Sequence, residues 1–171
     1  KGGTLDIRLA ERPSTAVPVS LRKKDILRLM EKVADWQIND WERGTKEQRM
    51  SHWVNATGLT GLVALSDISK KRKYIQYVKK TSEAMEWQPG PRRLFADDYC
   101  IGQVYARLYM KYRNKEMIAP WQALADSILA RPNNESLEWK DGSIRHREWS
   151  WCDALYMGPT ALSYLATATG Q

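Results

Sequence analysis

The chain has 171 residues, of which 43% are hydrophobic and 27% are charged. This length supports one domain with a substantial buried core, and no apolar run approaches the length of a membrane-spanning helix. The formal net charge of +7 favours anionic partners, which include nucleic acid, acidic lipid and acidic glycans. Composition therefore excludes a long disordered tract and leaves the class of partner open.

Apolar periodicity divides the chain into a short lead-in and a helical domain. Residues 1–19 contain two glycines, two prolines and little periodicity, so they are predicted to be extended. From position 20 to 171, apolar residues recur at the spacing of α-helices, and this part is predicted to form one domain. The six expected helices cover about 21–41, 55–66, 69–87, 98–112, 115–130 and 152–169.

The first and third of these helices differ in the width of their apolar faces. The first carries two adjacent apolar stripes and is predicted to have a broad buried face. These stripes are Ile26, Leu29, Val33 and Trp36, and Leu27, Met30, Ala34, Ile38 and Trp41. The third is apolar on one side, with Lys70 to Lys73, Lys79 and Lys80 turned outward. This alternation indicates an all-α fold of paired helices in two layers, and the lack of a fixed-period repeat favours a toroid over a solenoid.

Asp153 stands among aromatic residues where a loop becomes the last helix. Its neighbours include Trp149, Trp151 and Tyr156. Aromatic faces stack on sugar rings, and partial desolvation raises the pKa of carboxyl groups toward the range that a general acid needs. Asp153 is therefore the first catalytic candidate. The alternative interpretation is a helix cap beside ordinary core aromatics.

The pair Asp97-Asp98 begins the fourth predicted helix and supplies a second candidate. Asp98 is assigned to the cleft because it continues the inward register of Ile101 and Tyr105, which leaves Asp97 as the cap. A shift of one position would exchange the two residues. Two carboxyl groups in one cleft do not both ionise freely, although a helix N-terminus favours the ionised form.

Several residues near these acids are candidates for substrate binding. His146 lies in the loop before Asp153 and either contacts the substrate or belongs to the protein surface. Eight tryptophans against one phenylalanine is unusual for a core, because a buried indole N–H needs a partner. The tryptophans at predicted helix ends, which are the stacking candidates, are Trp41, Trp53, Trp149 and Trp151.

Cofactor signatures are absent from the sequence. The two cysteines form no Cys-x-x-Cys pair, and the two histidines lack further spaced ligands. The chain also has no phosphate-binding loop, dinucleotide fingerprint or nucleophile elbow. We therefore expect an activity that uses no metal and no organic cofactor.

Three motifs together resemble those of a known enzyme group. They are Trp53-x-Asn55-x-x-Gly58-Leu59, Asp97-Asp98 followed by Gly102-Gln103-x-x-x-x-Leu108-Tyr109, and Trp151-Cys152-Asp153-Ala154-Leu155-Tyr156-Met157. From about 21 to 171 the chain resembles the unsaturated glucuronyl and rhamnogalacturonyl hydrolases of glycoside hydrolase families 88 and 105. The resemblance implies an (α/α)6 barrel of twelve helices. This chain would supply about half of it and be incomplete at its C-terminal side.

The resemblance also implies a reaction and roles for individual residues. These enzymes hydrate the C4–C5 double bond of a terminal unsaturated uronic acid on oligosaccharides left by polysaccharide lyases. In this chain Asp153 resembles the general acid and base, and Asp98 resembles the second aspartate that positions and tunes it. His146 resembles a loop histidine that contacts the sugar, and Asn55 stands at a contact position where many relatives have an aromatic residue.

Further expectations concern partners, compartment and rival functions. Half a toroid would expose an apolar seam, which predicts a homo-oligomer or association with the missing half of the barrel. The family implies a periplasmic or extracellular setting, with the cytoplasm as the alternative, and no nucleic-acid or membrane partner. One rival is a non-catalytic helical module that binds acidic glycan or nucleic acid through a basic face. Another is an (α/α)6 glycosidase or epimerase that acts on saturated sugars.

Overall fold

The computed structural model describes residues 21–44, 48–133 and 151–171, and all the regular elements within them are helical. The predicted all-α class is therefore confirmed for this part of the chain, whereas the lead-in 1–19 lies outside it. The α-helices are α1 (Lys23–Glu42), α2 (Trp53–Ile68), α3 (Lys73–Ala84), α4 (Gly102–Tyr112), α5 (Ala119–Ala130) and α6 (Ala154–Thr169). Two 3-10 turns, η1 (Ala96–Tyr99) and η2 (Lys115–Met117), precede α4 and α5.

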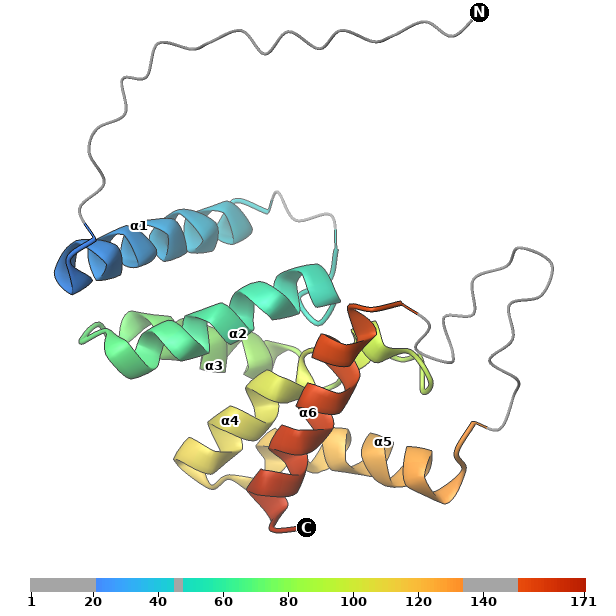
Figure 1. Cartoon of the computed structure of the whole chain (residues 1–171). Helices are drawn as coiled ribbons and strands as arrows, with labels where there is room; N and C mark the ends of the chain where they lie inside the picture. Colours follow the sequence, from blue (N-terminus) through green and yellow to red (C-terminus); the bar gives the residue numbers. More distant parts are fainter. Residues whose placement is uncertain (1–20, 45–47, 134–150) are drawn as a thin grey trace, which may run out of the picture.

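Alternate helices form the centre of the structure (Figure 1). Helix α4 packs along α6 and against α2, while α1 and α3 both pack on α2. Helices α2, α4 and α6 each bury at least five residues, more than α1, α3 or α5, as expected for an inner layer covered by neighbours. The described helices are thus arranged as the two-layer prediction requires. None of them combines the length and the apolar composition needed to cross a membrane.

Helix α1 departs from its prediction. Only Ala34 and Trp41 are buried in it, so the prediction of a broad buried face is wrong. Two salt bridges join α1 to the start of α3. Lys71 lies 2.6 Å from Glu31, and Lys73 lies 2.6 Å from Asp35. The stripe that remains exposed consists of Ile26, Leu29, Val33 and Trp36.

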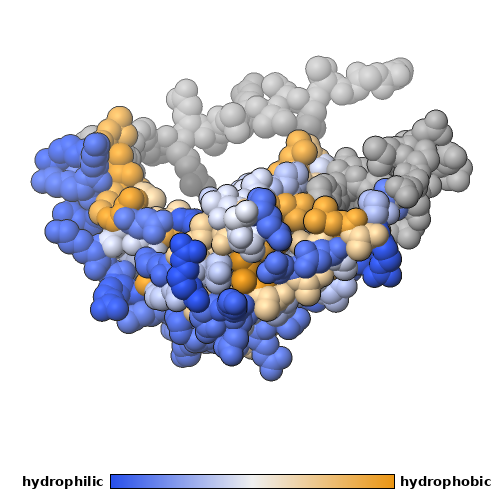
Figure 2. Space-filling model, turned by 90° about the horizontal axis from the view of Figure 1, so that it is seen from below, coloured by the Kyte–Doolittle hydropathy of each residue, from blue (hydrophilic) through white to orange (hydrophobic). Residues whose placement is uncertain are grey.

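Exposed apolar residues are not confined to α1. Leu129 on α5 and Leu155 on α6 are also exposed. Seen from below, the molecule shows hydrophobic patches between hydrophilic residues on that face (Figure 2). The packing of the described residues therefore leaves apolar surface on several helices.

The third helix ends earlier than predicted because the backbone reverses after it. Glu86 and Trp87 have φ values of 52° and 56°, which lie in the left-handed region that does not continue a right-handed helix. Trp87 is buried, and its ring meets Tyr105 of α4 edge-on at 5.7 Å between centroids. This packing holds the reversal in place and directs the loop after it toward η1.

Gly102 permits close contact between α4 and the buried ring of Trp121 on α5. A Cβ at this position would lie 2.6 Å from the ring, so Gly102→Ala is expected to lower the free energy of unfolding by about 1–3 kcal/mol. Gly61 in α2 faces open space, so Gly61→Ala is the matched control and is expected to gain up to about 1 kcal/mol. Urea unfolding followed by circular dichroism measures both changes. Equal stability of Gly102→Ala and the wild type would contradict this packing.

Candidate active site

A pocket of about 220 Å³ lies where the starts of α2, η1 and α6 meet. It is lined by Trp53, Phe95, Ala96, Asp97, Trp151, Asp153 and Ala154. We call it the two-aspartate pocket, because it brings together two carboxyl groups that are far apart in the sequence. Three aromatic side chains share its wall, which suits a ligand with both polar groups and apolar ring faces.

Asp153 enters this pocket from the beginning of α6. The backbone N–H groups of Tyr156 and Met157 donate to its carbonyl oxygen at 3.0 and 3.3 Å, which places it at the N-cap. Its side chain makes no capping hydrogen bond and is exposed. The interpretation of Asp153 as only a helix cap is therefore not supported, because its side chain caps no backbone N–H and the residue lines the pocket.

The second acid in the pocket is Asp97 rather than Asp98. Asp98 is wholly buried and does not line the pocket, so its predicted place in the cleft is corrected. The predicted register itself holds, because Asp98, Ile101 and Tyr105 are all wholly buried. The inward face of this segment is packed core and not the cleft, and the Asp98 carboxylate accepts hydrogen bonds from arginines there. Any role of either residue in catalysis stays a prediction.

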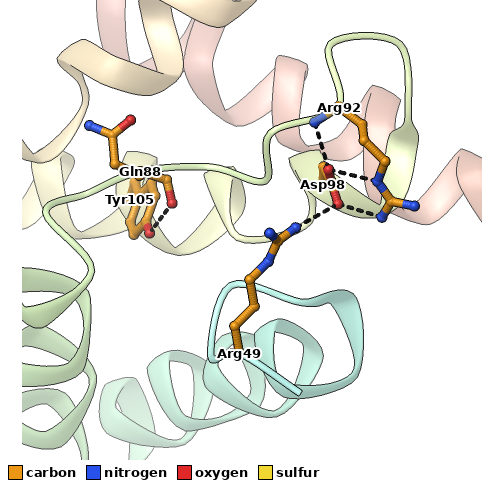
Figure 3. Close-up of polar contacts among 5 residues, drawn as sticks. All are labelled: Arg49, Gln88, Arg92, Asp98 and Tyr105. Atoms are coloured by element: carbon orange, nitrogen blue, oxygen red, sulfur yellow. Dashed lines mark hydrogen bonds and ion pairs between the residues drawn. The ribbon is translucent and has the colours of Figure 1, made fainter.

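Asp98 is held by two arginines (Figure 3). Arg92 donates to its carboxylate from the backbone N at 2.8 Å, from Nε at 3.0 Å and from Nη2 at 2.7 Å. Arg49 donates from Nη2 at 3.3 Å. These contacts satisfy a buried charge, which would otherwise be costly to remove from water.

The pKa of Asp97 is raised above its ordinary value. Partial burial is the largest cause, and the nearby carboxylates of Asp153 and Asp98 act in the same direction. The charges of Arg92 and His52 oppose the rise. Asp97 thus retains a proton to higher pH than a free aspartate does, as expected for one member of an acid pair in a shared pocket.

The predicted sugar-binding residues divide into three groups. Trp53 and Trp151 line the two-aspartate pocket. Trp41 and Asn55 do not line it, so their predicted contact with the sugar is corrected. Both are buried and bind each other, with Trp41 Nε1 donating to Asn55 Oδ1 at 3.0 Å. The amide of Asn55 in turn donates to the backbone carbonyls of 48 and 49. His146 and Trp149 lie outside the described residues.

Sequence reasoning missed Phe95 and Arg92. Phe95 lines the pocket, and the guanidinium carbon of Arg92 lies 3.5 Å from its ring centroid. The only sequence signal for either is proximity to Asp97. Within the described residues, no group of three or more His, Cys, Asp or Glu side chains is placed to hold a metal ion.

Comparison with known proteins places this chain in an enzyme family. The profile of Glycosyl Hydrolase Family 88 matches residues 29–171, which include every residue of the pocket. The chain belongs to this family. The resemblance inferred from the three motifs is thereby confirmed, and the all-helical structure agrees with a part of the (α/α)6 barrel of Glycosyl Hydrolase Family 88.

Two curated relatives are similar to this chain, and both bear the name unsaturated 3S-rhamnoglycuronyl hydrolase. The relative from Alteromonas sp. (strain LOR) is 25% identical over 175 residues, which cover 91% of this chain and 42% of the relative. The relative from Formosa agariphila is 26% identical over 126 residues, which cover 70% of this chain and 32% of the relative. The chain therefore spans less than half the length of these two family members.

Proposed function

We propose that this chain carries part of the active site of a hydrolase acting on oligosaccharides that end in a 4,5-unsaturated uronic acid. Family membership and the names of both relatives support this reaction class. The observation that carries the proposal is the two-aspartate pocket, where Asp97 and Asp153 stand among three aromatic rings. Such a pocket offers proton transfer beside surfaces that stack on a sugar ring.

The proposed reaction begins with transfer of a proton from Asp153 to C4 of the unsaturated ring. Positive charge then develops at C5 and is shared with the ring oxygen. A water molecule adds at C5 and gives a proton to the carboxylate that has just lost one, which restores the acid. The resulting hemiketal opens and releases the next sugar, so one water is consumed in each cycle.

Asp97 is proposed to position and tune Asp153. The raised pKa of Asp97 lets it keep a proton to higher pH than a free aspartate, and it lines the same pocket as Asp153. The role first assigned to Asp98 therefore passes to its neighbour. Trp53, Phe95 and Trp151 are proposed to hold the sugar ring against these acids.

The substrate is proposed to be an anionic lyase product. The relatives are named for rhamnoglycuronyl substrates, so unsaturated uronyl-rhamnose disaccharides come first, followed by pectin-derived products. The chain's formal net charge of +7 suits a uronate. A periplasmic or extracellular enzyme would meet such products, and we propose that setting with no nucleic-acid or membrane partner.

The test follows the ultraviolet absorbance of the uronate double bond in a panel of lyase-generated disaccharides. Decay of the absorbance together with release of the second sugar is the expected result. Release of sugar from saturated disaccharides alone would instead indicate an ordinary glycosidase or an epimerase-like enzyme. Binding of acidic glycan without turnover of any member of the panel would replace the proposal with the binding-module interpretation.

Trp53 and Trp151 provide a test of the stacking surface. Replacing either with alanine is expected to raise KM about tenfold, equivalent to ~1.4 kcal/mol of lost binding, because an aromatic face of the pocket is removed. Trp36 is the matched control, since it is exposed on α1 and lies outside the pocket. Steady-state kinetics on the preferred disaccharide measure the change, and equal KM values for all three variants would contradict the assignment.

A further inference from the structure

The proposed reaction leaves the buried carboxylate of Asp98 without a function. Asp98 is one of the largest wholly buried side chains and is the only carboxylate among them in the described residues. Removing such a charge from water is costly, and a buried ion pair is often no more stabilising than apolar residues of similar size. Its partner Arg92 remains about half exposed, with 46% of its side-chain surface accessible. A function related to the adjacent pocket would account for this arrangement.

Asp98 fixes the orientation of the Arg92 guanidinium. The two side chains meet in a fork, with Nε and Nη2 of Arg92 donating to Oδ2 and Oδ1 of Asp98 (Figure 3). A fork of two parallel hydrogen bonds fixes the plane of the guanidinium as well as its position. In that plane, Arg92 lies over the ring of Phe95, 3.5 Å from its centroid. Phe95 in turn lines the two-aspartate pocket.

The loop that carries Arg92 is anchored along its length. Tyr105 donates from its hydroxyl to the backbone carbonyl of Gln88 at 2.9 Å, and Gly90 donates from its backbone to the carbonyl of Asp98 at 3.0 Å. A Cβ on Gly90 would lie 2.1 Å from the Asp98 carboxyl carbon, so only glycine allows this approach. Arg92 therefore approaches the pocket from a loop that is fixed at 88, 90 and 92.

We propose that Asp98 and Arg92 are positioning residues for the two-aspartate pocket, with Asp98 holding the Arg92 guanidinium behind Phe95 and beside Asp97. Arg92 then has two effects: it supports the aromatic wall, and it places one positive charge near the catalytic pair. The charge of Arg92 already opposes the rise in the pKa of Asp97. This inference rests on the proposed function for its catalytic meaning, and on the Arg92–Asp98 fork and the Arg92–Phe95 contact for its geometry.

The charged and titratable groups around Asp97 come from every element at the pocket. They are His52 before α2, Arg92 in the loop, Asp98 and Cys100 around η1, and Asp153 at the start of α6. Arg49 also contacts Asp98, at 3.3 Å, but it is not among the groups that shift the pKa of Asp97. Arg49 and Arg92 both bind Asp98, and their side chains are exposed to nearly the same extent. Of the two, Arg92 is the one that lies over Phe95 in the pocket wall.

The test compares Arg92→Met, Arg92→Lys and the matched control Arg49→Met. Carbon-13 NMR titration of the Asp97 carboxyl group is expected to show a midpoint raised by about half a unit to one unit in Arg92→Met. Arg92→Lys keeps the positive charge, so its Asp97 midpoint is expected to lie close to that of the wild type. Arg49→Met is expected to leave the Asp97 midpoint unchanged. If Arg92→Met does not fold, Arg92→Gln replaces it, since its amide still donates to Asp98. Thermal denaturation identifies any variant that is merely unfolded.

The outcomes separate this inference from the proposed function. Equal midpoints in Arg92→Met, Arg49→Met and the wild type would overturn the positioning role. Equal shifts in both methionine variants would overturn it too, because the effect would then be general electrostatics. The titration needs no substrate, so failure of the wild type to hydrate an unsaturated uronate would reject the proposed function alone. Where turnover is present, the acidic limb of the kcat/KM profile should move with the Asp97 midpoint in Arg92→Met.

Discussion

Replacing Asp153 with asparagine is expected to lower kcat on an unsaturated uronyl disaccharide by about 10²–10⁴-fold, because the amide cannot donate the proton to C4. KM should change little, since the aromatic wall of the pocket is intact. Stability should stay within about 0.5 kcal/mol, because the Asp153 side chain is exposed and makes no capping hydrogen bond. Decay of the double-bond absorbance measures kcat.

The matched control for this change is Asp126→Asn. Asp126 is likewise exposed, but it lies on α5 and outside the two-aspartate pocket. Its variant should retain wild-type kcat. An Asp153→Asn enzyme that keeps kcat within tenfold of the wild type would remove Asp153 from the role of general acid.

Asp97→Asn is expected to lower kcat by at least about 10²-fold and, at the same time, to stabilise the fold at neutral pH. A folded-state pKa that is raised above the unfolded value contributes stability below the unfolded pKa, and this contribution is lost as pH rises through the folded value. Above its raised pKa, Asp97 is an ionised, partly buried carboxyl group, whereas asparagine carries no charge.

Thermal denaturation across a pH series tests this second prediction. The Tm of Asp97→Asn should exceed that of the wild type at pH 7, and the difference should narrow as pH falls through the raised pKa of Asp97. Gain of stability with loss of activity is typical of a functional residue held in an unfavourable environment. A lower Tm at pH 7, or a difference independent of pH, would contradict the electrostatic description of the pocket.

Sequence periodicity predicted which segments are helical and also the buried sides of α3 and α4, but not the buried face of α1. The two apolar stripes of α1 look equivalent in the sequence, yet only residues of the second, Ala34 and Trp41, are buried. Periodicity reports amphipathic character, whereas burial depends on the helices that pack against each face. The end of α3 was also predicted too late. The left-handed backbone that ends it lies at Glu86 and Trp87, and neither is the glycine or proline that usually marks such a break.

The candidate site could be predicted in part. Asp153, Trp53 and Trp151 were found from local motifs, since aromatic and acidic residues at helix starts leave a recognisable pattern. The choice between Asp97 and Asp98 depended on whether the inward face of this segment borders the cleft or the packed core, and the sequence pattern is the same in both cases. Arg92 reaches the site through contacts in space that no spacing rule predicts.

The most direct test of the central claim is a crystal structure of Asp153→Asn bound to an unsaturated uronyl disaccharide. We predict that the unsaturated ring lies in the two-aspartate pocket, stacked on Trp53 or Trp151, with C4 turned toward residue 153 and Asp97 beside it. A sugar bound elsewhere on the protein would contradict this account. So would a sugar that presents its anomeric carbon, rather than C4, to residue 153.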